Sequence, residues 1–340
     1  MSLNIKTVLL FFVLVLSVNS CKNPTENSTN SKNENDEPNI EEITKKIEAN
    51  DDNPDLYIQR AKLYQKEGNL NDAITDAQKA CQLDNKKYEN YLFLADLFLA
   101  ANQVQGTISS LNAVLGVEPN HVEANLKMSE LNLMFKRYDD AIKYANIVLE
   151  TDVYNSKAHF LRGFTFKEYG DTTKAVTSFS EAVKQNPEYY EAYVELGIIF
   201  SAKKDPIAVE YFKNAINLGR PLVDAHYNLA MFYQENGFPD KAIEVYKNII
   251  QLKPDYTFAY YNMGYIYLTF KGDPLTASNY FTKSIEFKPD YTEAYYNLGL
   301  CYEELKRYSE AQAALKNALK YTVNYEPAIE ALNRIDEKLR

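Results

Sequence analysis

The chain repeats itself with a period of about 34 residues, and this feature constrains its fold more than any other. The segments 191–197 (EAYVELG) and 293–299 (EAYYNLG) nearly coincide, and so do 225–230 and 259–264. A period of this length predicts a stack of similar supersecondary structures, each burying its apolar face against its neighbours. Extending the alignment gives eight repeats in succession: 54–87, 88–121, 122–155, 156–189, 190–222, 223–256, 257–291 and 292–325.

Two positions within the repeat hold small residues in nearly every copy. Small side chains there let two antiparallel helices approach closely, while large residues at positions 4, 7, 11 and 24 fill the space between repeats. Glycines between the two helices (Gly68, Gly170, Gly237) and prolines after the second helix (Pro119, Pro187, Pro254, Pro289) predict where each helix ends. Position 8 is Ala61, Ala95, Ser129, Gly163, Gly197, Ala230, Gly264 and Gly299; position 20 is Ala73, Thr107, Ala141, Ala175, Ala208, Ala242, Ala277 and Ala311.

This pattern resembles the tetratricopeptide repeat, over about four fifths of the chain. That family expects a bulky residue at position 4, which is Tyr57, Tyr91, Tyr193, Tyr260 and Tyr295 in five repeats, His159 and His226 in two, and Asn125 in the one that departs. The resemblance implies an all-α solenoid: eight helix pairs over 54–325, wound in a right-handed superhelix.

Segments 39–53 and 326–340 are expected to be capping helices. In the second segment, one apolar stripe is formed by Ala328, Ile329, Leu332, Ile335 and Leu339.

The first 20 residues have the pattern of an export signal. After Lys6, residues 8–18 (VLLFFVLVLSV) form an apolar run. As a helix it would be about 16 Å long, roughly half of the ~30 Å hydrocarbon core, and so too short to span a bilayer. The residues Val18-Asn19-Ser20-Cys21 resemble the lipobox of bacterial lipoproteins, in which the cysteine is diacylated, for example with palmitate, and becomes the new amino terminus. An ordinary signal peptide with a coincidental cysteine and an uncleaved anchor remain alternatives.

Residues 21–38 are expected to be a disordered tether, because 22–38 contain no leucine, isoleucine, valine or aromatic residue that could be buried. Together, the lipobox and the tether predict a lipid-anchored protein of the bacterial cell envelope. By resemblance, Lys22 after the cysteine favours the outer membrane over the inner one.

The sequence indicates no chemistry. A net charge of −10 without a basic run argues against nucleic acid as a partner. The chain has no phosphate-binding glycine loop, no HExxH and no GxSxG motif. His121, His159 and His226 lie at different positions in different repeats, and no second ligand is beside His159 or His226 at helical spacing. We therefore expect no enzyme, no metal, no cofactor and no small-molecule substrate. Cys81 and Cys301 are expected to be small buried hydrophobes.

Partner proteins are expected on the first helices of the pairs. In the family, positions 2, 5, 6, 9, 12 and 13 of these helices line the concave face. In repeats 6–8 they hold Tyr227, Tyr261 and Tyr296 at position 5, Asn228, Asn262 and Asn297 at position 6, and Met231, Tyr265 and Leu300 at position 9. A row of carboxamides can both donate to and accept from an extended peptide backbone. The alternatives are that the asparagines merely face water and that the tyrosines pack against a neighbouring repeat or another copy.

The sequence thus favours a scaffold or adaptor that binds an extended peptide or a helix of envelope proteins in the groove of repeats 6–8. The alternative is a fixed structural subunit of an outer-membrane assembly or secretion complex, bound through other surfaces of the solenoid.

Overall fold

The structure is a computed structural model that describes residues 38–339, in which it places eighteen helices and no strand. The predicted signal peptide, Cys21 and the predicted tether up to residue 37 lie outside the described residues. No helix of the described part combines the length and the apolarity that crossing a membrane requires.

The described residues belong to two compact units, which divide between Asp52 and Asn53. The first unit contains helix α2 (Ile40–Ala49), whose N-cap Asn39 accepts a hydrogen bond from the Glu42 amide over 2.9 Å. Its isoleucines Ile43 and Ile47 are four residues apart and share one face. The role of this helix as a cap stays a prediction.

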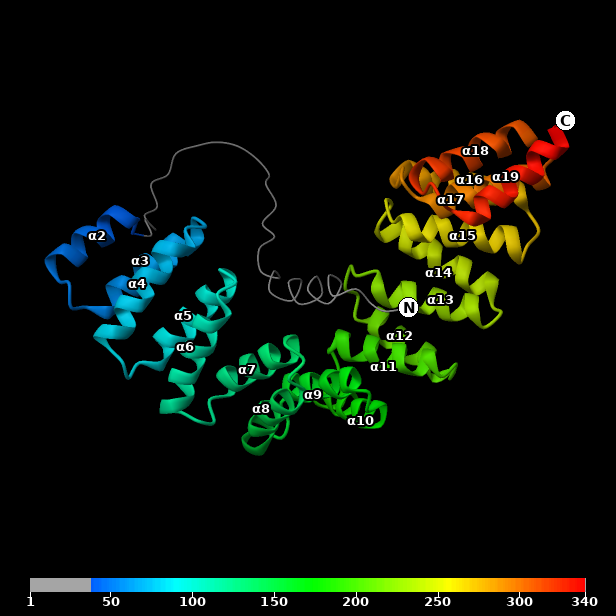
Figure 1. The fold of residues 1–340 in the computed structure, drawn as a ribbon. Coiled ribbons are helices and arrows are strands. Elements are labelled where there is room, and N and C mark those ends of the chain that lie inside the picture. Colours follow the sequence, from blue (N-terminus) through cyan, green and yellow to red (C-terminus); the bar gives the residue numbers. More distant parts are fainter. Residues whose placement is uncertain (1–37, 340) are drawn as a thin grey trace, which may run out of the picture. The chain divides into compact units, whose positions relative to one another are not determined.

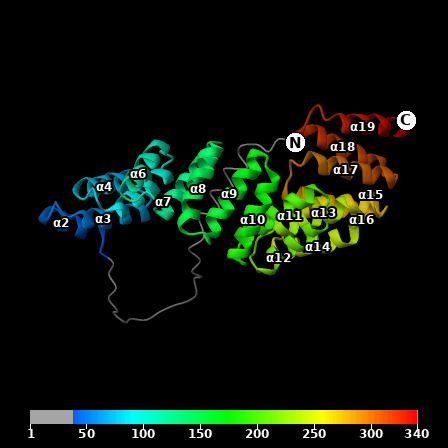
Figure 2. The same cartoon turned by 90° about the horizontal axis from the view of Figure 1, so that it is seen from below.

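The second unit contains the helices α3 to α19, and its pairs follow one another in chain order (Figures 1 and 2). Each predicted repeat holds one pair, which confirms the prediction of an all-α fold of consecutive helix pairs. The pairs are α3 (Pro54–Lys66) and α4 (Leu70–Leu83), α5 (Tyr88–Ala100) and α6 (Val104–Val117), α7 (Val122–Met134) and α8 (Tyr138–Thr151), α9 (Ser156–Tyr169) and α10 (Thr172–Gln185), α11 (Tyr190–Ala202) and α12 (Ile207–Asn217), α13 (Asp224–Glu235) and α14 (Pro239–Leu252), α15 (Thr257–Thr269) and α16 (Pro274–Phe287), and α17 (Thr292–Glu304) and α18 (Tyr308–Tyr321).

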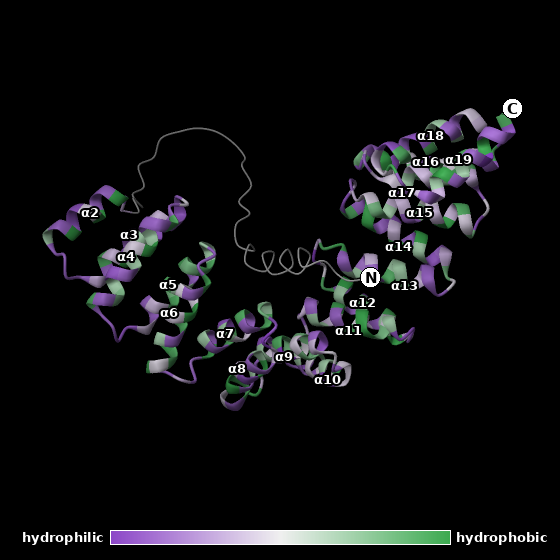
Figure 3. Cartoon of the chain, viewed as in Figure 1, coloured by the Kyte–Doolittle hydropathy of each residue, from purple (hydrophilic) through white to green (hydrophobic). Residues whose placement is uncertain are grey.

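The core runs along the stack instead of gathering at one centre. Apolar and polar residues alternate on all of these helices (Figure 3), and buried clusters bridge successive pairs. One such cluster joins Phe212 of α12, Tyr246 of α14 and Met263 of α15. The last helix, α19 (Glu326–Leu339), packs on α17 and α18 and buries Ile335 completely. Stability therefore depends on contacts between neighbouring repeats.

The small residues at position 8 face large side chains of the second helix. The ring of Phe212 lies so close to Gly197 that a Cβ there would be only 2.4 Å from it. Gly163, Gly264 and Gly299 face Phe179, Phe281 and Leu315 in the same way. The predicted close approach of the two helices is therefore confirmed where position 8 is glycine.

The turn between the two helices requires a positive φ. Gly68, Gly170 and Gly237 adopt it, as the sequence predicts, with φ between 80° and 95°. Non-glycine residues hold the same place in four other repeats with φ between 55° and 58°: Asn102, Lys136, Lys204 and Lys306. The sequence did not predict this, because the tight turn and the packing of its flanking helices impose a conformation that these residues do not prefer.

Position 4 has a polar role that the repeat pattern alone does not reveal. In three repeats its side chain bonds to the carbonyl six residues earlier, in the linker from the preceding repeat. Asn125 Nδ2, His159 Nε2 and Tyr260 Oη each lie 2.9 Å from that oxygen, which belongs to Pro119, Val153 and Pro254 respectively. Asn125, which departs from the family pattern in size, thus keeps the hydrogen bond.

Candidate functional site

Within residues 53–339, the first helices of three pairs of neighbouring repeats contact one another, namely α7 and α9, α11 and α13, and α15 and α17. Helix α17 also contacts α19, whereas neighbouring second helices are not in comparable contact. The surface formed by the first helices, here called the first-helix face, is therefore the tighter side of the stack. This is the surface on which the sequence predicts partner binding.

The first-helix face of repeats 2–5 is rich in charges that pair with one another. At position 9, Asp96 accepts from Lys127 Nζ over 2.5 Å, and Glu130 pairs with Lys157 of the next repeat over 2.8 Å. Lys167 Nζ lies 2.6 Å from Oε2 of the buried Glu195. Because these charges are matched between repeats, this half of the face offers few unpaired groups to a partner.

The same face is apolar at position 9 in repeats 5–8. Position 9 there holds what is here called the position-9 row: Ile198, Met231, Tyr265 and Leu300. Ile198 is 36% exposed and Tyr265 is 37% exposed, and Phe258 at position 2 is 42% exposed. Met231 and Leu300 are half-buried and pack against the buried clusters of their repeats. A partly exposed apolar row of this kind is typical of a protein-interaction surface.

The position-5 tyrosines lie beside this row, half-buried, and each contacts an aromatic residue at the end of its own repeat. The ring centroids are 5.9 Å apart for Tyr227 and Tyr256, 4.8 Å for Tyr261 and Tyr291, and 5.6 Å for Tyr296 and Tyr325. Burial raises the pKa of Tyr256 and of Tyr261 to about 12. One side of each ring therefore packs within its own repeat, whereas the sequence had raised packing against a neighbouring repeat or another copy.

Sequence reasoning missed this aromatic pair, although a signal was present. Tyrosine is the last residue of repeats 4, 6, 7 and 8, and in repeat 4 the partner is Phe160, stacked on Tyr189 at 5.0 Å. The pair recurs because the linker that follows the second helix returns beside position 5 of the same repeat.

The three asparagines at position 6 have two different environments. Asn262 Nδ2 donates to the hydroxyl of Tyr227 over 3.4 Å, and Asn297 Nδ2 donates to that of Tyr261 over 3.0 Å. Both asparagines are buried, whereas Asn228 is half-buried and donates to the Asp224 carbonyl of its own helix. That these side chains bind a peptide backbone stays a prediction. Their placement gives Asn262 and Asn297 a second role, which is to orient a tyrosine of the preceding repeat.

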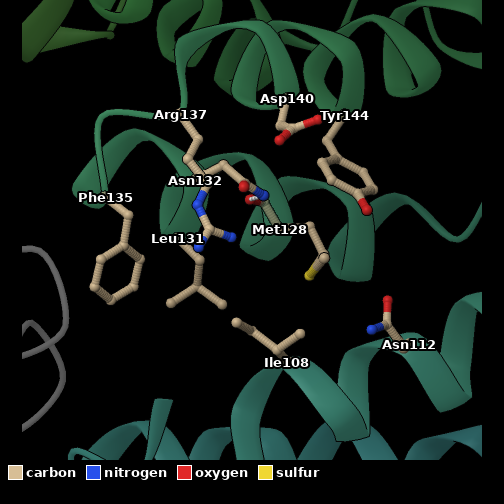
Figure 4. Close-up of a pocket in the computed structure, with 9 residues that line it drawn as sticks. All are labelled: Ile108, Asn112, Met128, Leu131, Asn132, Phe135, Arg137, Asp140 and Tyr144. Carbon is tan, nitrogen blue, oxygen red and sulfur yellow. Dashed lines mark hydrogen bonds between the residues drawn. The ribbon is translucent and has the colours of Figure 1, made fainter. Parts of the chain in front are cut away.

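Two cavities lie at equivalent places between repeats, away from the position-9 row. The first, of about 170 Å³, opens between α6 and the pair α7–α8, with Met128, Asn132, Asp140 and Tyr144 on one side and Asn112 on the other (Figure 4). The second, of about 280 Å³, occupies the corresponding place between α8 and the pair α9–α10. Neither cavity can be predicted from the sequence, because each depends on side-chain volumes brought together from three helices.

The histidines and cysteines have structural environments. His159 is buried, and His121 Nδ1 accepts from the Ala124 amide as an N-cap. Burial lowers the pKa of His226. Cys81 and Cys301 are free and buried, as predicted, and burial raises the pKa of each thiol to about 12. Among residues 38–339, no group of three histidine, cysteine or acidic side chains is arranged to hold a metal ion.

Family models described as tetratricopeptide repeat match residues 54–87, 92–154, 223–256 and 271–337, which together make up more than half of the chain. Among curated proteins, the BBSome complex member BBS4 homolog of Drosophila melanogaster is 25% identical over 150 residues. That alignment covers 44% of this chain and only 31% of the fly protein.

Solved structures share the fold at low sequence identity. The C-terminal part of a TPR repeat-containing protein from Cytophaga hutchinsonii has a TM-score of 0.61 at 21% identity, covering 70% of this chain and 98% of that one. Pseudomonas aeruginosa PilF has a TM-score of 0.52 at 16% identity, covering 60% and 93%. A tetratricopeptide repeat protein from Parabacteroides merdae has a TM-score of 0.50 at 18% identity, covering 73% and 98%.

Proposed function

This chain belongs to the tetratricopeptide repeat family, and from that premise we propose that it is a lipid-anchored adaptor of a bacterial cell envelope. It binds an extended peptide or a helix of a partner protein along the first-helix face of repeats 6–8. The observation that carries this proposal is the change along the face, from charges paired between repeats to an apolar row with no such pairing.

The partner that fits this surface presents apolar side chains at regular intervals. Met231, Tyr265 and Leu300 recur once per repeat, so they offer a series of separate apolar contacts to one continuous segment. A helix supplies such anchors at i, i+3, i+4 and i+7, and an extended peptide supplies them at alternate residues. Apolar burial would contribute most of the affinity, at roughly 25 cal/mol per Å² of apolar surface removed from water.

The tyrosines add directional contacts. The hydroxyls of Tyr227 and Tyr261 accept from Asn262 and Asn297, and a hydroxyl that accepts still has its own hydrogen to donate. Two donors held in place by buried asparagines are suited to peptide carbonyls, whatever the side chains of the partner. In this proposal the asparagines act through the tyrosines instead of contacting the peptide themselves.

The membrane part of the proposal rests on the lipobox resemblance at Cys21. An acylated Cys21, followed by a segment poor in apolar residues, would hold the repeats near a membrane surface and leave the first-helix face accessible. The outer membrane is the proposed location, on the basis of Lys22.

The test is a crosslinked pull-down from native envelopes, read by mass spectrometry. The bait is the full chain, either unchanged or carrying Met231→Lys, Tyr265→Lys and Leu300→Lys together. The matched control carries Ile207→Lys, Leu252→Lys and Leu275→Lys, on the second helices α12, α14 and α16, where these residues are 38%, 48% and 56% exposed. We expect the same partner with the parent and the control, and its loss with the first variant.

If the partner is retained by the first variant and lost with the control variant, the result would support the second candidate. That candidate is a fixed structural subunit of an outer-membrane assembly or secretion complex. The exposure of Ile207, Leu252 and Leu275 favours it, because a subunit of that kind would bind through the second-helix surface as well. A partner that is lost only with the control variant would therefore replace the groove proposal with this one.

A further inference from the structure

The cavity of about 280 Å³ in repeat 4 is lined by a cation-rich set of residues in an otherwise acidic protein. Arg162 and Phe166 come from α9, Lys174, Thr177 and Ser178 from α10, and Asn146 from α8 of the preceding repeat. None of these residues belongs to the position-9 row, so this cavity is separate from the proposed groove.

Arg162 occupies position 7, and another repeat shows how an arginine is ordinarily held there. In repeat 1 the same position is Arg60, which faces Asp76 at position 23. Arg60 Nε lies 2.7 Å from Asp76 Oδ2, and Nη2 lies 2.8 Å from Oδ1, in the two-point arrangement that a guanidinium and a carboxylate prefer. The carboxylate raises the pKa of Arg60.

In repeat 4 the acid at position 23 is replaced by Ser178. Arg162 then has three neutral neighbours, all at 3.3 Å: Ser178 Oγ from Nε, Asn146 Oδ1 from Nη1 and His159 Nδ1 from Nη2. These distances are longer than those of good charge-assisted hydrogen bonds. Burial lowers the pKa of Arg162, although its guanidinium remains charged at neutral pH.

The two acids nearest to the cavity both pair with lysines, one of which is Lys174 of the cavity itself, and the charge of Glu181 also acts on Arg162. Asp171 caps α10 and lies 2.9 Å from Lys174 Nζ, and Glu181 pairs with Lys184 over 3.1 Å. Lys174 Nζ also lies 5.3 Å from the centre of the Phe166 ring, at the edge of the cavity. The cavity therefore has a partly buried guanidinium, an ammonium at its edge and no carboxylate in contact with Arg162.

The small side chain of Ser178 leaves room beside Arg162 that a larger side chain would occupy. The equivalent position is Tyr144, Tyr211 and Tyr280 in repeats 3, 5 and 7. In repeats 5 and 7 these rings stack on Phe200 and Tyr267, both at 5.4 Å, and fill the site. The cavity in repeat 3 (Figure 4) has Met128 and Asp140 where repeat 4 has Arg162 and Lys174, and its lining contains a different cation, Arg137, together with the carboxylate of Asp140.

We propose that the cavity of repeat 4 binds a carboxylate group, which takes the place that Asp76 has in repeat 1. Arg162 donates to both carboxylate oxygens, Lys174 lies at the edge of the site while it pairs with Asp171, and the Asn146 amide and the Ser178 hydroxyl supply neutral hydrogen bonds. The carboxylate comes from an acidic side chain of a partner protein or from a free small carboxylic acid, and the same chemistry recognises both.

The test uses the full chain with arginine labelled by ¹⁵N, and follows the Nε–H resonance of Arg162 by NMR. Sodium acetate is titrated against sodium chloride at equal ionic strength. The two sources are compared with the capped peptide Ala-Ala-Glu-Ala-Ala and its glutamine counterpart. We expect a saturable shift with acetate and with the glutamate peptide, and no such shift with chloride or the glutamine peptide. Saturation at a lower concentration of peptide than of acetate assigns the site to a protein partner, and the opposite order assigns it to a free acid.

Two variants make the outcome decisive. Ser178→Asp restores the acid found in repeat 1, so the resonance should be shifted without ligand and should no longer respond to acetate. Arg162→Lys keeps the charge but removes the two-point geometry; with uniform ¹⁵N labelling of parent and variant, we expect the response of the Ser178 amide to acetate to be at least tenfold weaker in the variant. The proposal would be overturned if acetate shifted the Arg162 resonance no more than chloride does. It would also be overturned if the response of that resonance to acetate were undiminished in Ser178→Asp.

Discussion

At the scale of single residues, the close pairing of helices depends on matched side-chain sizes within each repeat. Where position 8 is glycine, the facing residue is Phe179, Phe212, Phe281 or Leu315, and all four are completely buried. In repeat 1 the pair is Ala61 and Ala77 instead. A Cβ added to one of the glycines has no room unless a ring in a packed interior moves.

We predict that Gly197→Ala destabilises the protein by about 1–3 kcal/mol, the usual cost of overpacking a core. The added methyl group would lie 2.4 Å from the ring of Phe212. The measurement is the midpoint of urea unfolding followed by circular dichroism.

Gly116→Ala is the matched control, because Gly116 is also in a helix and has nothing within 4 Å of the Cβ position. Alanine there should be neutral or stabilise by up to about 1 kcal/mol, since it is the better helix former. Equal effects of the two substitutions would show that position 8 is not under packing constraint.

Residue roles could be predicted from the sequence only where they follow from size. The small residues at positions 8 and 20 were identified because their pattern repeats eight times. The hydrogen bond of Asn125 to Pro119 and that of Asn297 to Tyr261 could not be found, because each joins different structural elements in a direction that periodicity does not encode. An alignment of the repeats shows the size of each side chain, but it does not show the direction in which a carboxamide points.

At the scale of helices, the attachment of α19 depends on one carboxylate of the last repeat. Glu303 of α17 lies 2.7 Å from Arg334 and 2.8 Å from Lys338, both on α19. The hydrogen bond from Arg334 is the main cause that lowers the pKa of Glu303 to about 2. A carboxylate with a lowered folded-state pKa stabilises the folded form most at pH above its unfolded pKa of about 4.3.

We therefore predict that α19 loosens as the pH falls from about 5 towards 2, because protonation of Glu303 removes the ion pairs. The expected loss in the free energy of unfolding is about 1–3 kcal/mol. The lower end of this range is favoured because Arg334 and Lys338 are partly exposed and solvent screens their charges. The measurement is hydrogen exchange of the α19 amides, corrected for the intrinsic pH dependence.

Glu303→Gln provides the control for this prediction. Its α19 amides should be less protected than those of the parent at pH 7, and their protection should change little between about pH 5 and 2. Parent amides that keep constant protection over this range would contradict the assigned role of Glu303.

The asparagines give a second prediction at this scale, since they connect consecutive repeats. Asn297→Ala removes a buried hydrogen bond to Tyr261 and should cost about 1–2 kcal/mol. Asn228→Ala is the matched change at the same position of another repeat, where the amide bonds only to its own helix, and should stay within about 0.5 kcal/mol. If Asn297→Ala and Asn228→Ala lowered the free energy of unfolding equally in thermal unfolding, the role of Asn297 in orienting Tyr261 would be contradicted.

The helices and their register could be predicted from the sequence, and the cavities could not. Repeat length, proline and glycine fix where helices start and stop, because those constraints are local. The space beside Arg162 is lined by Ser178, at a position where repeats 3, 5 and 7 have tyrosine, and by Asn146 from the repeat before. That combination becomes visible only when three helices are placed side by side.

At the scale of the whole molecule, the body of repeats and the amino-terminal segment have separate tasks in the proposed function. The first-helix face changes character along the chain, and the segment before residue 38 determines where that face is presented. Anchoring by an acylated cysteine is a chemical proposal about Cys21, and it is testable independently of the groove.

We predict that Cys21→Ser abolishes incorporation of labelled palmitate and moves the protein from the membrane fraction to the soluble fraction. Acyl chains contribute roughly 0.8 kcal/mol of membrane affinity per buried CH₂, and two chains are needed for stable anchoring. A variant that stays in the membrane fraction without label would support an uncleaved anchor instead.

The most direct test of the central claim is site-specific photocrosslinking in the native envelope, with a benzophenone amino acid at Tyr265 or at Leu275. Both positions are exposed, at 37% and 56%, and they lie on the first and second helix of the same repeat. The account predicts that Tyr265 crosslinks to a discrete partner protein and that Leu275 does not. Crosslinking of the same partner from Leu275 alone would contradict it and place the interaction on the second-helix surface.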